Sequence, residues 1–182
     1  MIAQQIEILE EVNATVEDTF VPLLHEQLNW KPAPDSWSIA QCLDHLIRTN
    51  ESYLPQLAEI SQGKKRPTLW ERAPLLPNLF GRLLLKASRP SGEGKMQAPK
   101  AFRPLQSNLP VETPSHFLAH NRALMRQFEA LPKEGLHRYR LTSPASKIIV
   151  LRLEEVVLIL PAHEQRHLQQ ALRVMNAEGF PA

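Results

Sequence analysis

The chain has 182 residues, of which 43% are hydrophobic and 22% are charged, and its formal net charge is +2. These proportions are those of an ordinary globular domain, so they exclude a disordered or fibrous chain and give little reason to expect a nucleic-acid partner. The length is that of one domain, and we expect residues 1–182 to fold as a single unit.

The chain contains a single cysteine, Cys42, which excludes an internal disulfide framework. Its first residues lack the charged-then-apolar layout of a signal peptide, and no segment reaches the run of about 18 apolar residues that a membrane span requires. We therefore expect a soluble, cytoplasmic protein with no membrane partner. The short basic run Lys64–Arg66 is expected to be a solvated helix end.

The first thirty residues carry apolar side chains at three- and four-residue steps, which predicts an amphipathic helix. Pro22 should kink or divide this helix, because proline removes a backbone donor. A second helix is predicted to begin at Ser38, since Ser38 and Gln41 have the spacing of a capping box. We expect that helix to run to about Gly63.

The middle of the chain, residues 64–113, is rich in proline and glycine and has poor periodicity, which indicates a long crossover. Within it, only Leu75 to Ala87 has the pattern of a short helix. A third helix is predicted from Thr113 as N-cap and Pro114 as the first helical residue, and Pro132 ends it.

Short extended pieces are expected at Tyr139 to Leu141 and at Lys147 to Leu151. A fourth helix then carries apolar residues at helical spacing from Leu153 to Met175 and stops before Gly179. Four amphipathic helices with one long connection predict an all-α four-helix bundle, in which the crossover lets helices two and three run parallel.

Two histidines, His163 and His167, lie four residues apart on the fourth helix and within its apolar stripe. Buried imidazoles need partners, and a pair with this spacing can chelate one metal ion. His45 is the candidate third ligand, because it lies at the edge of the apolar stripe of the second helix, beside polar residues. Three neutral histidines leave at least one coordination position open, which is the arrangement of a catalytic metal.

Each histidine also has a plainer interpretation, as a polar group that is simply hydrogen-bonded in or near the core. His116 and His120 repeat the four-residue spacing on the third helix, but neither lies in the middle of its apolar stripe, so we expect them at the surface or rim. Cys42 precedes His45 by one turn, and free cysteines of this kind are commonly inert core residues. Trp37 is expected to be a packing anchor at the start of the second helix.

The segment His163–His167 also fits H-E-x-x-H, the signature of zinc peptidases in which the glutamate is the general base. The extended form of that signature is not met, because Gln170 and Arg173 stand where a glycine and a third histidine are expected. A peptidase is therefore disfavoured. Glu164 still lies near the middle of the apolar face, where it is either a supporting partner or general base beside a metal, or one half of a buried salt bridge.

Two segments carry a resemblance to a known family. Trp37–Leu46, which reads WSIAQCLDHL, resembles the opening of helix two in the DinB-like superfamily. Ala162–Ala171, which reads AHEQRHLQQA, resembles that family's closing H-x-x-x-H-x-x-Q segment. The order, the spacing and the proline-rich middle agree over nearly the whole chain, although residues 64–113 add no specific motif. The likeness is to the DinB_2 and YfiT-like metal-dependent branch.

The resemblance implies an up-down-down-up bundle, frequently a homodimer, with one zinc, nickel or iron ion held by His45, His163 and His167. Relatives include transferases that use a low-molecular-weight thiol such as bacillithiol or mycothiol. We therefore expect a metal-dependent transferase that joins such a thiol to a small-molecule substrate, with Glu164 accepting a proton. The alternatives are a metal-dependent hydrolase and a non-catalytic metal- or ligand-binding bundle. The family's fold gives no reason to expect DNA binding.

Overall fold

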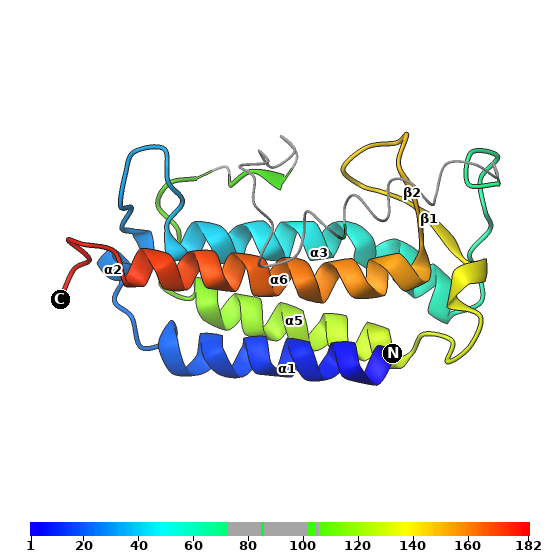
Figure 1. The fold of residues 1–182 in the computed structure, drawn as a ribbon, viewed down its shortest axis with the longest axis horizontal. Helices are drawn as coiled ribbons and strands as arrows, with labels where there is room; N and C mark the ends of the chain where they lie inside the picture. The colour runs from blue at the N-terminus through cyan, green and yellow to red at the C-terminus, as the bar shows by residue number, and fades with distance from the viewer. Residues whose placement is uncertain (73–84, 86–101, 105) are drawn as a thin grey trace.

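Four long helices form the body of the protein in the computed structural model, which describes residues 1–72, 85, 102–104 and 106–182. They are α1 (Ile2–Thr19), α3 (Ile39–Ser61), α5 (Thr113–Glu129) and α6 (Leu153–Met175). α1 and α3 each pack against both α5 and α6. Along the bundle, α1 and α6 run in one direction while α3 and α5 run in the other (Figure 1). The predicted all-α, up-down-down-up four-helix bundle is therefore confirmed, with α3 and α5 as the parallel pair.

The boundaries of the helices in the first third of the chain follow local sequence signals. The chain around Pro22 separates α1 from the short α2 (His25–Asn29), as predicted. At the start of α3, Ser38 Oγ accepts a hydrogen bond from Gln41 N, and Gln41 Oε1 accepts one from Ser38 N, both at 3.2 Å. The capping box is thus present. α3 ends just before Gly63, whose φ of +67° is the left-handed conformation that glycine adopts most easily.

The start of α5 differs from the prediction by one residue. Thr113 is the first helical residue and Glu112 is the N-cap. The Thr113 hydroxyl donates to the carbonyl oxygen of Pro110 at 2.6 Å, so it belongs to the preceding turn and does not cap the helix amides. Pro114 still lies in the first turn, where its missing N–H costs no hydrogen bond.

A small β-hairpin precedes α6. Its strands are β1 (Arg140–Thr142) and β2 (Val150–Arg152), which pair antiparallel with Leu141 opposite Leu151. Both extended pieces that the sequence predicts are present, each displaced toward the C-terminus. None of the helices in the described ranges is long and apolar enough to cross a membrane.

The crossover between α3 and α5 is described at its two ends, and the helix predicted over residues 75–87 lies, apart from Leu85, outside the described residues. Near its C-terminal end, Phe102 and Leu109 are buried in the bundle. The side-chain amide of Asn29 donates to the carbonyl oxygen of Leu109 at 2.9 Å and accepts from its N–H at 2.8 Å. This end of the crossover is thereby fixed to α2.

Two groups of buried apolar side chains fill the bundle. One gathers residues of all four helices with the hairpin, and includes Leu9, Leu57, Phe128, Leu141 and Leu160. The other gathers the opposite halves of the same helices with α2, and includes Val16, Leu28, Leu43, Phe117 and Leu168. The core therefore has an apolar half at each end of the bundle.

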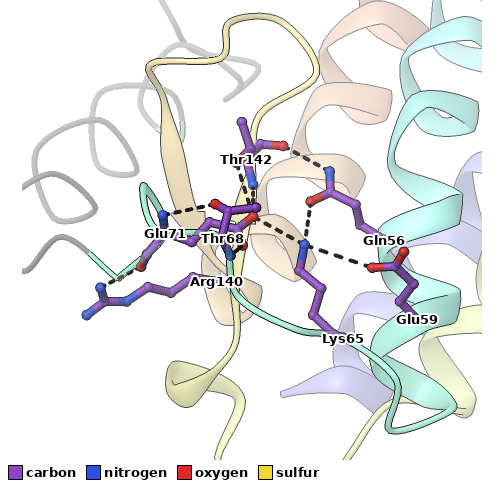
Figure 2. Close-up of polar contacts among 7 residues, drawn as sticks. All are labelled: Gln56, Glu59, Lys65, Thr68, Glu71, Arg140 and Thr142. Atoms are coloured by element: carbon purple, nitrogen blue, oxygen red, sulfur yellow. Dashed lines mark hydrogen bonds and ion pairs between the residues drawn. The ribbon is translucent and has the colours of Figure 1, made fainter.

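The buried carboxylate of Glu71 fastens the start of the crossover to the hairpin (Figure 2). Its Oε1 accepts hydrogen bonds from Lys65 Nζ at 3.2 Å and from the N–H and the hydroxyl of Thr142, both at 3.0 Å. Its Oε2 accepts from the N–H of Thr68 at 2.8 Å. The Lys65 side chain is only 9% exposed, so the prediction of a solvated run at Lys64–Arg66 is wrong at its central residue.

Glu71→Gln should lower the free energy of unfolding at neutral pH by about 1–3 kcal/mol, because it leaves the buried ammonium of Lys65 beside an uncharged amide. Burial alone would raise the pKa of Glu71, but the hydrogen bonds from Thr68, Lys65 and Thr142 and the charge of Lys65 bring it below the usual 4.5. Stabilisation from a lowered carboxyl pKa is present above the unfolded-state pKa and is lost as the pH falls through the folded-state pKa.

Urea unfolding at a series of pH values measures this effect. The stability gap between wild type and Glu71→Gln should close as the pH falls below about 4.5, and a gap that does not depend on pH would contradict the assignment. Glu59→Gln is the matched control, because it removes an exposed carboxylate that lies 4.0 Å from the same Lys65 ammonium and should have little effect.

Candidate metal centre

Three histidine side chains converge between α3 and α6. His45 comes from α3, and His163 and His167 come from consecutive turns of α6. One ring nitrogen from each lies within 4.8 Å of the others, and Nε2 of His45 is 3.2 Å from Nε2 of His163. The three ring centroids are 4.5 to 5.0 Å apart in pairs, with the rings at steep angles to one another. The structure thus brings together the three residues that the sequence singles out.

The tautomer of His45 is set by the crossover. Its Nδ1 lies 2.7 Å from the carbonyl oxygen of Phe102, which can only accept, so Nδ1 carries the proton. The lone pair of His45 is therefore on Nε2, the atom that faces His163. A backbone carbonyl that orients an imidazole in this way is the usual support of a histidine metal ligand.

The donor set fits a divalent metal ion. Two imidazole nitrogens that each lie about 2.0–2.1 Å from a tetrahedral zinc ion are about 3.3 Å apart, close to the 3.2 Å between His45 and His163. Ordinary hydrogen bonds do not satisfy every nitrogen of the cluster, although Nε2 of His163 has a contact with Nε2 of His45. Nδ1 of His163 and Nδ1 of His167 are buried and have no hydrogen-bond partner among the residues that the structure describes.

Burial keeps the three imidazoles uncharged. It lowers the pKa of His163 well below the usual 6.5, and repulsion from Arg166, and from His167 or His45 when protonated, acts in the same direction. Burial lowers the pKa of His167 to about 3, and that of His45 is lowered by burial although the Phe102 carbonyl and Asp44 oppose this. Neutral imidazole is the form that binds a metal, so the centre needs no deprotonation at neutral pH.

Trp37 covers one side of the centre. Its ring stacks on His167 with centroids 5.6 Å apart and planes 21° apart, and it lies 4.9 Å from the ring of His45. The sequence predicts only a packing anchor at this position. The structure shows that the packing partners are two of the three candidate ligands, so the indole holds their rings in place and shields them from water.

Glu164 is completely buried and turns toward α3 and α5. Its Oε1 accepts a hydrogen bond from the side-chain amide of Asn50 at 2.7 Å, and its Oε2 accepts one from that of Asn121 at 2.9 Å. Both of these hydrogen-bond partners are amides, which does not support the buried salt bridge that is one of the two interpretations from the sequence. Burial raises the pKa of Glu164 to about 8, and the two amide bonds oppose that shift.

The sequence does not single out Phe102, Asn50 or Asn121. Nothing in the sequence marks a backbone carbonyl as the support of His45, because the crossover has no periodic pattern from which its path can be predicted. The two asparagines carry a detectable signal, since each is a polar residue on the apolar face of its helix and both are fully buried.

The remaining candidates stay outside the cluster. His116 is exposed, as predicted, whereas the His120 side chain is only 10% exposed, with Nδ1 4.0 Å from a carboxylate oxygen of Glu51. Cys42 is completely buried, and burial raises the pKa of its thiol to about 12 although Arg173 opposes the shift. The thiol is therefore protonated at neutral pH, as predicted for an inert core cysteine.

Comparisons with known proteins agree on the family and the fold. The family model DinB_2, described as the DinB superfamily, matches residues 8–171. A similar solved structure is that of YfiT from Bacillus subtilis, described as a probable metal-dependent hydrolase with an unusual four-helix bundle topology. The likeness covers 99% of this chain and 89% of that one, with a TM-score of 0.59 and 15% sequence identity, so it shows the shared fold. No curated protein matches the chain.

His163→Ala should abolish metal binding, because it removes the ligand whose Nε2 lies 3.2 Å from that of His45. Elemental analysis of protein purified without chelator or affinity metal should find close to one metal ion per wild-type chain and none in the variant. His116→Ala is the matched control, because it removes an exposed histidine and should keep the metal. Equal metal content in the wild type and in His163→Ala would contradict the assignment.

Proposed function

The chain belongs to the DinB superfamily, and from that premise we propose that it is a metal-dependent enzyme that hydrolyses a small-molecule substrate at the three-histidine centre. One observation carries the proposal, namely that three uncharged imidazoles converge without a fourth histidine, cysteine or carboxylate among the described residues. Three protein ligands and an open position are the arrangement of catalytic metal sites, whereas structural sites are closed by four. The description of YfiT, which shares the fold, supports hydrolysis.

The residues of this chain would hold the metal and shape its surroundings. A divalent ion bound by His45, His163 and His167 supplies Lewis acidity, which polarises a substrate and lowers the pKa of a bound nucleophile. The Phe102 carbonyl fixes the tautomer of His45. The Trp37 ring closes one side, so a substrate has to approach from another direction. Zinc, nickel and iron all suit imidazole ligands, so the donor set does not choose between them.

Glu164 has a supporting place in this proposal. Both of its oxygens accept hydrogen bonds from buried asparagine amides, and its side chain has no exposed surface. A general base must be within hydrogen-bond reach of the proton that it removes, and these contacts point Glu164 into the bundle. We therefore propose that Glu164 supports the ligands from the core side and does not act on the substrate directly.

Transfer of a low-molecular-weight thiol is the second candidate function. Three neutral ligands add no negative charge to a divalent ion, so the open position favours an anionic ligand such as a thiolate. The single cysteine of the chain cannot provide that group, because Cys42 is buried and its pKa is raised to about 12. A thiol nucleophile would have to come from a separate small molecule.

The proposal predicts turnover that depends on the metal and on the histidines. The protein, loaded with zinc, nickel or iron, would be assayed against ester, amide and phosphoester substrates, and separately against an electrophile with a low-molecular-weight thiol. Mass spectrometry of the product distinguishes addition of water from addition of the thiol. Activity should disappear after chelation and in His167→Ala, and persist in His116→Ala.

Thiol adducts without hydrolysis products would favour the second candidate. Fully metal-loaded protein that turns over no substrate in either assay would contradict both, and would favour a non-catalytic metal- or ligand-binding bundle.

A further inference from the structure

A layer of buried polar side chains crosses the middle of the bundle, with one residue from each long helix. The four are Asn13 of α1, Asn50 of α3, Asn121 of α5 and Glu164 of α6, and they are 9%, 0%, 0% and 0% exposed. Their side chains form one chain of hydrogen bonds. Asn50 donates to Glu164 at 2.7 Å, and the amide of Asn121 donates to Glu164 and to Asn13, both at 2.9 Å.

The layer lies where the two apolar halves of the core meet. On α3 the apolar group near α2 includes Leu46, and the group near the hairpin begins at Tyr53, with Asn50 between them. On α6 the corresponding residues are Leu160 and Leu168, with Glu164 between them. A similar change occurs on α5 around Asn121 and on α1 next to Asn13.

Stability alone does not account for such a layer. Burying polar groups costs free energy even when they are hydrogen-bonded, and well-packed apolar residues in their place are often neutral or stabilising. Buried polar networks do have one attested use, which is to specify a single register between packed elements. Here the network joins all four helices, so it fixes how they are rotated and shifted along their axes relative to one another.

The polar layer lies next to the metal centre along the axis of the bundle. Glu164 directly follows His163 and precedes His167 by one turn, and Asn50 lies little more than one turn beyond His45. The bond from Asn50 to Glu164 therefore joins α3 to α6 beside the point where these two helices bring their imidazoles together.

A small change in this alignment would matter to a metal. Rotation of α6 by about 10° would move a side-chain atom about 6 Å from the helix axis by about 1 Å. Metal–nitrogen distances tolerate only about 0.2 Å. Rotational freedom of α6 against α3 would therefore be enough to open the centre.

We propose that Asn13, Asn50, Asn121 and Glu164 form an inter-helix clamp that sets the metal affinity and coordination geometry of the three-histidine centre. The inference rests on the proposed metal centre and deepens it. The four side chains are positioning residues, because they act on the centre through α3 and α6 and not by touching the metal or the substrate. Hydrogen bonding, and not the charge of Glu164, is the property that the clamp requires.

Two substitutions of Glu164 separate the effect of hydrogen bonding from the effect of charge. Glu164→Leu removes both hydrogen bonds. Glu164→Gln can keep both, because its oxygen can accept from Asn121 while its NH₂ donates to Asn50 after a flip of that amide. The flip is available because Oδ1 of Asn50 has no hydrogen-bond partner within the described part of the chain.

The experiment measures the zinc Kd of the full chain by chelator competition, and the visible spectrum of the cobalt(II) form as a report on coordination geometry. Glu164→Leu and Asn50→Leu should raise the Kd by about 10- to 100-fold, the usual effect of removing groups that orient metal ligands, and should alter the cobalt spectrum. Glu164→Gln should retain the wild-type Kd and spectrum.

Tyr53→Phe is the matched control, because it removes one buried hydrogen bond, to Ser143 at 3.3 Å, from the next turn of α3. It should leave both the Kd and the spectrum unchanged. Circular dichroism and urea unfolding confirm that each variant is folded where binding is measured. If Glu164→Leu does not fold, Asn50→Leu carries the test, because it removes only one of the two bonds to Glu164.

If folded Glu164→Leu and Asn50→Leu keep the wild-type affinity and spectrum, the proposed role of the clamp is wrong. Metal binding by the three histidines would be unaffected by that result. Loss of metal from Tyr53→Phe as large as that from Asn50→Leu would also overturn the clamp, because any loosening of α3 would then suffice. A wild type that takes up no metal would overturn the proposed function and the clamp with it. Because the readout is binding, a metal-loaded protein without turnover would overturn only the proposed function.

Discussion

Three imidazoles share a small volume between α3 and α6, and keeping them there uncharged is the constraint on which the rest of this structure depends. Burial lowers the pKa of each imidazole, so all three are neutral and have a free lone pair at neutral pH. Burying a polar atom without a partner costs free energy of folding. The surroundings reduce the freedom of the rings. Phe102 fixes His45 from the crossover, and Trp37 lies against His45 and His167. A divalent ion would provide one shared partner for the three converging imidazoles.

The order of the helices is part of the same arrangement. Because α3 and α5 run in the same direction, the end of α3 and the start of α5 lie at opposite ends of the bundle (Figure 1). At the C-terminal end of the crossover, the carbonyl of Phe102 meets His45, and at its start Glu71 is bound to the hairpin. A bundle with short connections throughout would have no backbone at this position. The long crossover thus contributes directly to the candidate centre, although it adds nothing to the four-helix core pattern.

The sequence predicts the helices and the three histidines because both depend on periodicity. Apolar spacing places His163 and His167 on the buried face of α6, and the capping box at Ser38 places the start of α3. Contacts between segments that are distant along the chain cannot be predicted from apolar spacing or local capping motifs. The burial of Lys65 needs the partner Glu71, and the role of Glu164 needs Asn50 and Asn121, which lie 114 and 43 residues away along the chain. The N-cap of α5 is misplaced by one residue, because the Thr113 hydroxyl binds the turn before it and not the helix.

The central claim is that His45, His163 and His167 bind one divalent metal and leave a coordination position open. X-ray absorption spectroscopy at the metal edge of the loaded protein tests it most directly, because it counts and identifies the atoms bound to the ion. We expect scattering from three imidazoles at about 2.0–2.1 Å with at least one further light atom from solvent, which a small anion can replace. A closed first shell of four protein ligands, or a shell without histidine scattering, would contradict the account.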